Sequence, residues 1–128
     1  MDEFWAMLEG KLHAYSNNLG NVYSCRVWEG TSDGRGYGRL WVKWPGENAR
    51  VLERVHRLSI MSQYRWTRGD FPTTDQTGKR LETSHLCHMK SCIWREHLVV
   101  ERHDTNMDRQ HCKAQGHCSK DHLPHCLL

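Results

Sequence analysis

The residues with the clearest chemistry are the cysteines and histidines in the last third of the chain. Five of the six cysteines and eight of the ten histidines lie between His85 and Cys126. Thiolates and neutral imidazoles are ligands that Zn²⁺ prefers, four at a time in a tetrahedron. Packing alone does not explain this density, so the region predicts two zinc sites that bracket one reactive histidine.

A first zinc site is predicted from three evenly spaced residues. Cys87, Cys92 and His97 follow one another at intervals of five residues, which leaves one ligand to be found elsewhere. Cys25 is the only cysteine outside the cluster, so we expect it to be the fourth ligand. His88 is a competing ligand.

A second zinc site is predicted from residues that lie close together in sequence. Its expected ligands are Cys112, Cys118, His122 and Cys126. With this set every cysteine is used once, in two sites of three cysteines and one histidine. His117 and His125 remain alternatives to His122, because both lie within five residues of it.

His85 and Asn106 remain once these ligands are assigned. The pattern places His85 at the end of a strand and Asn106 in the first turn of a later helix. A neutral imidazole can take a proton from water, and an amide oxygen can hold a divalent cation such as Mg²⁺. The alternative is that a lone histidine at a strand end is structural, and spacing alone does not decide between the two.

The elements that must position these residues follow from hydrophobic periodicity and turn residues. Helices are predicted at 2–16, 53–64 and 105–111, the last capped by Asp104. A three-stranded antiparallel meander is predicted with strands at 22–29, 37–44 and 49–52. Two further strands are expected at 81–85 and 98–101, with polar loops at 65–80 and 86–97. The fold class is therefore α+β.

Composition supports a small metal-stabilised domain. At 128 residues, with 38% hydrophobic residues and a mean hydropathy of -0.80, the apolar core is thin. Histidines interleaved with cysteines, and the lack of an apolar leader or membrane stretch, favour metal ligation over disulfides. We therefore expect an intracellular protein, nuclear or cytoplasmic, without a membrane partner. The formal charge of +3 does not by itself argue for nucleic acid.

The predicted meander could contact DNA. Its second strand alternates Arg39, Trp41 and Lys43 with an apolar side. A basic two-stranded ribbon fits the major groove, although an ordinary solvated sheet face gives the same pattern.

One set of residues resembles a known family. The string Ser84-His85-Leu86-Cys87-His88, followed by Cys92, His97-Leu98, Asn106, Arg109 and Cys112, closely resembles the His-Cys box homing endonucleases. These belong to the His-Me finger, or ββα-metal, nucleases. A weaker match continues upstream through Cys25, Gly36-Tyr37-Gly38-Arg39 and Val55-His56-Arg57-Leu58.

The resemblance implies a role for each matching position. His85 matches the general base, Asn106 the ligand of one catalytic Mg²⁺ or other divalent ion, and Arg39 an arginine beside the scissile phosphate. Both predicted zinc sites match structural sites of the family. Its antiparallel sheet reads double-stranded DNA, which makes DNA-contacting candidates of Arg26, Trp28, Trp41 and Lys43.

The chain also departs from the family. Ile93-Trp94-Arg95-Glu96 stands where members often carry Asn-Pro. A relative dimerises through a longer C-terminal tail, whereas this chain ends two residues after Cys126, so a homodimer stays an open alternative.

We therefore expect one His-Me finger nuclease domain over 1–128, acting as a Mg²⁺-dependent endodeoxyribonuclease. Its parts are an N-terminal helix (1–20), a DNA-facing antiparallel sheet (21–54), a ββα-metal motif with the first zinc loop (81–111) and the second zinc site (112–128). One alternative is a non-catalytic, zinc-stabilised DNA-binding module of the SMAD DNA-binding-domain type. Another is a protein-interaction module with exposed tryptophans as anchors.

Overall fold

The computed structural model describes residues 1–118 and 122–128. The helices are α1 (Asp2–Ala14), α2 (Val55–Tyr64) and α3 (His103–Gln115), with a short 3₁₀ turn, η1 (Arg95–His97). The strands are β1 (Ser16–Asn18), β2 (Arg26–Trp28), β3 (Arg39–Val42), β4 (Val51–Arg54), β5 (Leu81–His85) and β6 (Leu98–Arg102). Among the described residues, no helix is long and apolar enough to cross a membrane.

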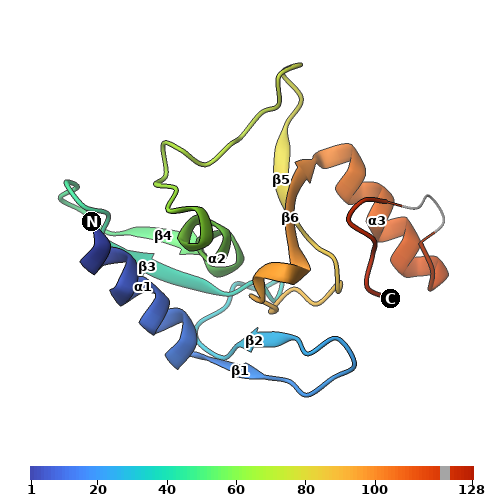
Figure 1. Cartoon of the computed structure of the whole chain (residues 1–128), viewed down its shortest axis with the longest axis horizontal. Helices are drawn as coiled ribbons and strands as arrows, with labels where there is room; N and C mark the ends of the chain where they lie inside the picture. The colour runs from blue at the N-terminus through green and yellow to red at the C-terminus, as the bar shows by residue number, and fades with distance from the viewer. Residues whose placement is uncertain (119–121) are drawn as a thin grey trace.

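The strands form separate hairpins and no continuous sheet within the described residues. β1 pairs with β2, β3 with β4, and β5 with β6, each pair antiparallel. Figure 1 shows the β5–β6 hairpin standing between α2 and α3, with the two chain termini at opposite ends of the molecule. The α+β class with antiparallel hairpins is confirmed.

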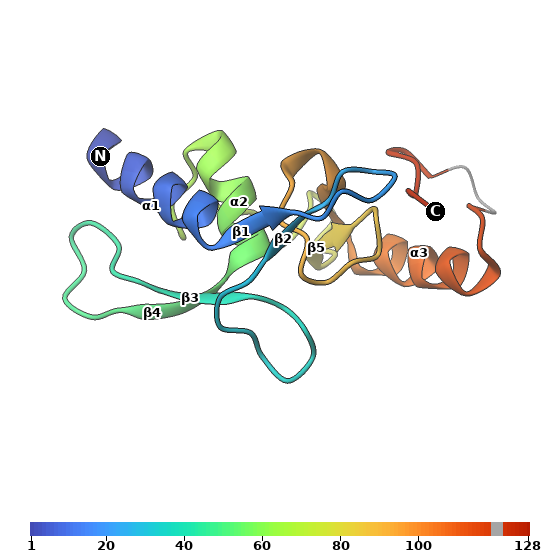
Figure 2. The same ribbon diagram turned by 90° about the horizontal axis from the view of Figure 1, so that it is seen from below.

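The main core lies where α1 and α2 meet the β3–β4 hairpin. Helix α1 buries Phe4, Trp5, Leu8 and Leu12, whose spacing places them on one side. Figure 2 shows both helices on the same side of the hairpin. Val42 and Trp44 are buried, while Trp41 and Lys43, which alternate with them, are exposed. The alternation expected for this segment is therefore observed.

The predicted three-stranded meander over 21–54 is wrong. On one edge β2 pairs with β1, a segment that the sequence predicts as the end of the first helix and the turn after it. Its other edge contacts the loop before η1, because the Trp28 amide donates to the Ser91 carbonyl and the Ile93 amide to the Arg26 carbonyl. Both edges of β2 are thus occupied, so β3 pairs with β4 instead.

The last third of the chain follows the predicted order of strand, loop, strand and helix. β5 has the predicted bounds, and β6 extends one residue further than expected. Helix α3 is longer than predicted, since it begins at His103 and continues past Cys112. The N-cap is Arg102, so Asp104 lies in the first turn and is not the cap. An acidic residue in the first turn still interacts favourably with the helix dipole.

Two glycines make room for the buried indole of Trp28. A Cβ atom at Gly38 would lie 2.4 Å from Cδ1 of Trp28, and one at Gly30 would lie 2.7 Å from the same ring. Gly38→Ala therefore forces the indole or the backbone to move, and we expect a loss of about 1–3 kcal/mol in the free energy of unfolding.

Gly10→Ala is the matched control, because it lies in α1 with nothing within 4 Å of its Cβ position. It should stabilise the protein by roughly 0.5–1 kcal/mol, since glycine is a poor residue in a helix interior. Urea unfolding of the two zinc-loaded variants checks both values. Equal effects of the two substitutions would contradict the packing argument.

Candidate metal centres and active site

The first predicted zinc ligand set comes together as a compact cluster. Cys25 precedes β2, Cys87 and Cys92 lie in the loop after β5, and His97 ends η1. One ligand atom from each lies within 4.8 Å of every other. The His97 Nδ1 atom is 3.5 Å from the Cys25 sulfur and 3.4 Å from the Cys92 sulfur. A tetrahedral Zn²⁺ separates neighbouring nitrogen and sulfur ligands by about 3.5 Å, so the cluster fits the ion.

The pKa values of the three cysteine thiols indicate why this cluster suits a cation. A hydrogen bond from the Cys87 thiol lowers the pKa of Cys92 to about 5. The same bond, together with burial, raises the pKa of Cys87. Burial also raises the pKa of Cys25. The protein groups alone therefore favour one thiolate, and a divalent cation would supply the charge that three thiolates need.

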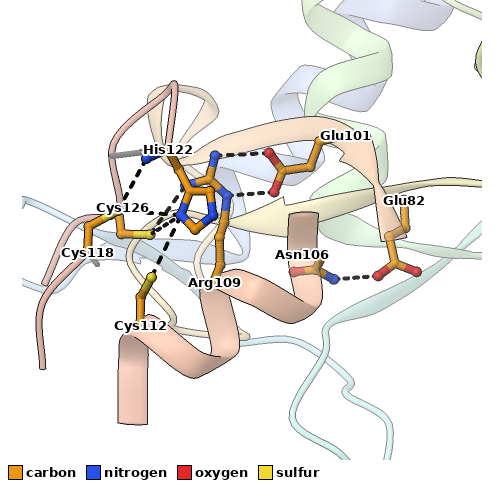
Figure 3. Close-up of polar contacts among 8 residues, drawn as sticks. All are labelled: Glu82, Glu101, Asn106, Arg109, Cys112, Cys118, His122 and Cys126. Carbon is orange, nitrogen blue, oxygen red and sulfur yellow. Dashed lines mark hydrogen bonds and ion pairs between the residues drawn. The ribbon is translucent and has the colours of Figure 1, made fainter. Parts of the chain in front are cut away.

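The second cluster unites the end of α3 with the C-terminal segment. The His122 Nδ1 atom is 3.7 Å from the Cys112 sulfur, 3.4 Å from that of Cys118 and 3.8 Å from that of Cys126. Figure 3 shows the imidazole directed at the three sulfurs. Residues 119–121 of the expected zinc segment lie outside the described residues. The two Cys₃His clusters are consistent with two structural zinc ions.

The geometry selects His122 over its neighbours. The exposed His117 ring lies against the Gln115 carbonyl, 3.3 Å away, and His125 is also exposed. We expect the purified protein to carry two zinc ions per chain, one for each cluster. His122→Ala should retain one, while His125→Ala should retain both.

Inductively coupled plasma mass spectrometry on desalted protein measures this stoichiometry. The two variants are matched, because each removes one histidine within four residues of Cys126. A full zinc complement in His122→Ala, or a loss in His125→Ala, would contradict the ligand assignment.

Arg109 connects the second cluster to the β5–β6 hairpin. Its side chain is fully buried, with 0% exposed, and bonds both oxygens of Glu101 at 2.6 and 2.9 Å. The remaining guanidinium nitrogen donates to the Cys126 sulfur at 3.3 Å. One cation thus contacts both a mostly buried carboxylate and a cluster sulfur (Figure 3). The sequence motif includes Arg109 but does not give it a role. Its position one helical turn before Cys112 is the signal that could have placed it beside the second cluster.

Arg109→Met should destabilise the zinc-loaded protein by about 3–5 kcal/mol, because it leaves the mostly buried Glu101 charge unpaired. Arg109→Met combined with Glu101→Met should recover much of this loss, since an apolar pair carries no desolvation cost. Urea unfolding of the wild type and both variants gives the comparison. If the double variant is as unstable as the single one, the ion pair is not the source of the effect.

His85 lies at the end of β5 and faces a small cavity. The residue is 8% exposed, and its Nε2 atom lies 2.9 Å from the Cys92 carbonyl oxygen. A carbonyl can only accept, so Nε2 carries the hydrogen and Nδ1 keeps a lone pair. Burial lowers the pKa of His85 to about 4. The imidazole is therefore neutral near pH 7 and able to accept a proton.

His85 and Asn106 line the same cavity, which has a volume of about 200 Å³. Lys90 and Lys113 also line it. A second cavity of about 520 Å³ shares Tyr37, Thr83, Asn106 and Met107 with the first, so the two adjoin. The larger cavity is lined by four arginines, namely Arg35, Arg54, Arg57 and Arg80.

Three rings form one wall of this region. His56 packs against His85 with 4.8 Å between ring centroids, and Tyr37 lies 5.3 Å from His56 and 5.9 Å from His85. Burial, followed by repulsion from the His85 ring when that ring is protonated, lowers the pKa of His56 well below its usual value. These contacts hold the His85 ring in place.

The expected DNA-contacting residues are only partly available on the surface. Trp28 is 6% exposed and donates its indole hydrogen to the Thr31 carbonyl, so its assignment to a DNA-facing surface is wrong. The Arg26 guanidinium is bonded to the Ser16 hydroxyl and the His13 carbonyl. Trp41 is 52% exposed, and Lys43 is exposed beside it.

Arg39 is not placed with the other catalytic candidates. It lies opposite Arg54 in the β3–β4 pair and does not line either of the two cavities that hold Asn106. Arg54 does line the larger one, where it bonds Asp33 at 2.8 Å and lies over the Tyr37 ring.

The fold and the two ligand clusters define a small zinc-binding α+β domain. Residues 24–127 match a protein family described as the zinc-binding loop region of homing endonuclease. The match spans most of the chain, so the protein belongs to this family. No curated protein and no solved structure matches it. Membership implies a DNA endonuclease, with DNA as the substrate.

Proposed function

We propose that this chain is a divalent-cation-dependent endodeoxyribonuclease in which His85 is the general base. The observation that supports this is the shared cavity of His85 and Asn106, which come from the strand and the helix of one β5–β6–α3 unit. A base and a cation ligand on one cavity suit hydrolysis of a phosphodiester bond. Family membership supplies the substrate class.

The proton route follows from the hydrogen bond of His85. Since Nε2 donates to the Cys92 carbonyl, Nδ1 is the atom that would take a proton from the attacking water. The bond also stabilises the imidazolium that forms, as an acceptor does for the second ring nitrogen of a catalytic histidine. Cys92 thus serves twice, through its sulfur in the first cluster and through its carbonyl at His85.

Asn106 would hold the divalent cation through its amide oxygen. Its Nδ2 atom donates to Glu82, so the oxygen is the atom left for the ion, and amide oxygens are suitable ligands for Mg²⁺. When bound, the cation supplies positive charge for the leaving oxygen and the phosphate. A single protein ligand indicates weak cation binding before DNA arrives.

Arginines of the larger cavity would neutralise the phosphates of the bound strand. Arg35 and Arg57 line this cavity together with Arg54, beside the Asn106 end that both cavities share. Fixed cations placed where charge develops are a large part of phosphoryl-transfer catalysis. Arg39 at the scissile phosphate stays a prediction. The two zinc ions would be structural, because each cluster already offers four ligands and leaves no position open.

Nicking of supercoiled plasmid in the presence of Mg²⁺, with and without EDTA, tests the proposal. We expect cleavage that EDTA stops, and a fall of about 10²–10⁴-fold in His85→Ala, the usual contribution of a general base. The same gel separates nicked from linear product and reports whether one strand or both are cut.

His111→Ala is the matched control, since His111 is an exposed histidine of α3 bonded only to Gln115 in the described residues. It should cut at the wild-type rate. His85→Ala must keep two zinc ions and its affinity for duplex DNA for the result to count. Cleavage by His85→Ala at the wild-type rate would contradict the assignment. Binding without any cleavage by the wild type would favour a non-catalytic DNA-binding module.

A further inference from the structure

Glu82 contacts the proposed cation ligand directly. Its carboxylate lies on β5, three residues before His85, and its Oε1 atom accepts a hydrogen bond of 2.5 Å from Nδ2 of Asn106. Figure 3 shows the Asn106 amide with its nitrogen turned toward Glu82 and its oxygen turned away.

This contact decides which amide atom is available to a cation. An ionised carboxylate only accepts hydrogen bonds, so the NH₂ group must face it. The opposite orientation would place the amide oxygen against the carboxylate and present two N–H donors to the cation. Burial raises the pKa of Glu82, but the hydrogen bonds from Asn106 and His103 lower it by more. The pKa of Glu82 therefore lies below its usual value.

Glu82 is itself held in place. The His103 Nδ1 atom lies 3.0 Å from Glu82 Oε1, and an Arg80 nitrogen lies 3.4 Å from Oε2. His103 can instead accept from Arg80, which lies 2.9 Å from the same nitrogen. In either tautomer the carboxylate remains the acceptor for Asn106. Glu82 is also only part-exposed, which limits its freedom to move.

We propose that Glu82 is the positioning residue of the catalytic cation site: it fixes the Asn106 amide so that Oδ1 faces the ion. The inference rests on the proposed nuclease function and adds a residue of this chain to it. Groups that orient a metal ligand from behind contribute about 10- to 100-fold to metal affinity or activity.

The first measurement is the Mg²⁺ concentration that gives half-maximal plasmid nicking. Glu82→Ala should raise it roughly 10- to 100-fold, with duplex affinity and zinc content unchanged. Glu82→Gln should give a smaller increase, because its amide oxygen can still accept from Asn106 but its nitrogen permits the flipped arrangement. Rescue toward the wild type by Glu82→Gln therefore separates positioning from a loss of folding.

Asp104→Asn is the matched control for charge. Asp104 is exposed in the first turn of α3, two residues from Asn106, and it makes no contact with the Asn106 amide in the described structure. It removes one negative charge as Glu82→Gln does and should leave the half-saturating Mg²⁺ near the wild-type value. An equal shift in Asp104→Asn would reduce the role of Glu82 to general electrostatics and overturn the proposal.

A second measurement does not depend on cleavage. The side-chain amide resonance of Asn106, identified by its loss in Asn106→Ala, is followed by ¹⁵N nuclear magnetic resonance during a titration with Mg²⁺ alone. It should shift at lower Mg²⁺ in the wild type than in Glu82→Ala. Identical titrations in the two proteins would overturn the inference. If the wild type never cuts DNA, the nuclease proposal fails, while this titration still decides whether Glu82 positions the amide.

Discussion

The structure depends on two cysteine–histidine clusters whose thiols need a bound cation in order to be fully ionised. Among the described residues, three two-stranded hairpins share no continuous sheet, and one apolar cluster packs between the helices and hairpins. The first cluster joins the segment before β2, the loop after β5 and the end of η1 in one place. Because three thiolates close together repel one another, a bound Zn²⁺ would supply both the cross-link and the neutralising charge. Metal binding would therefore contribute directly to the stability of the folded domain.

The two clusters support opposite halves of the candidate active site. The first holds Cys92, whose carbonyl fixes the tautomer of His85. The second cluster takes Cys112 from α3, and the Arg109–Glu101 ion pair joins that helix to the β5–β6 hairpin. These contacts position Asn106, which lies one helical turn before Arg109. Each catalytic candidate is thus anchored by a different cluster. Loss of either ion would disturb the relative position of the base and the cation ligand.

The polar residues around the cavities form a second layer of support. His56 and Tyr37 pack against the His85 ring, while Glu82 receives the Asn106 amide. Cationic side chains then surround the site, from Lys90 and Lys113 on one side to the arginines of the larger cavity. This distribution suits a polyanionic strand, although the net formal charge of +3 is small. Local placement, more than total charge, would therefore favour DNA at this site.

The sequence by itself determined the ligand chemistry, since the spacing of Cys and His predicted both Cys₃His sets, including Cys25 from far upstream. It also determined the β5–β6–α3 order, because hydrophobic alternation and periodicity are local properties. Only the tertiary structure decided which strand β2 pairs with, because pairing depends on which segments occupy its two edges. For the same reason the sequence did not predict the burial of Trp28 or the contacts of Glu82 and Arg109. The burial and the partners of a side chain depend on residues distant in sequence, which a local pattern does not contain.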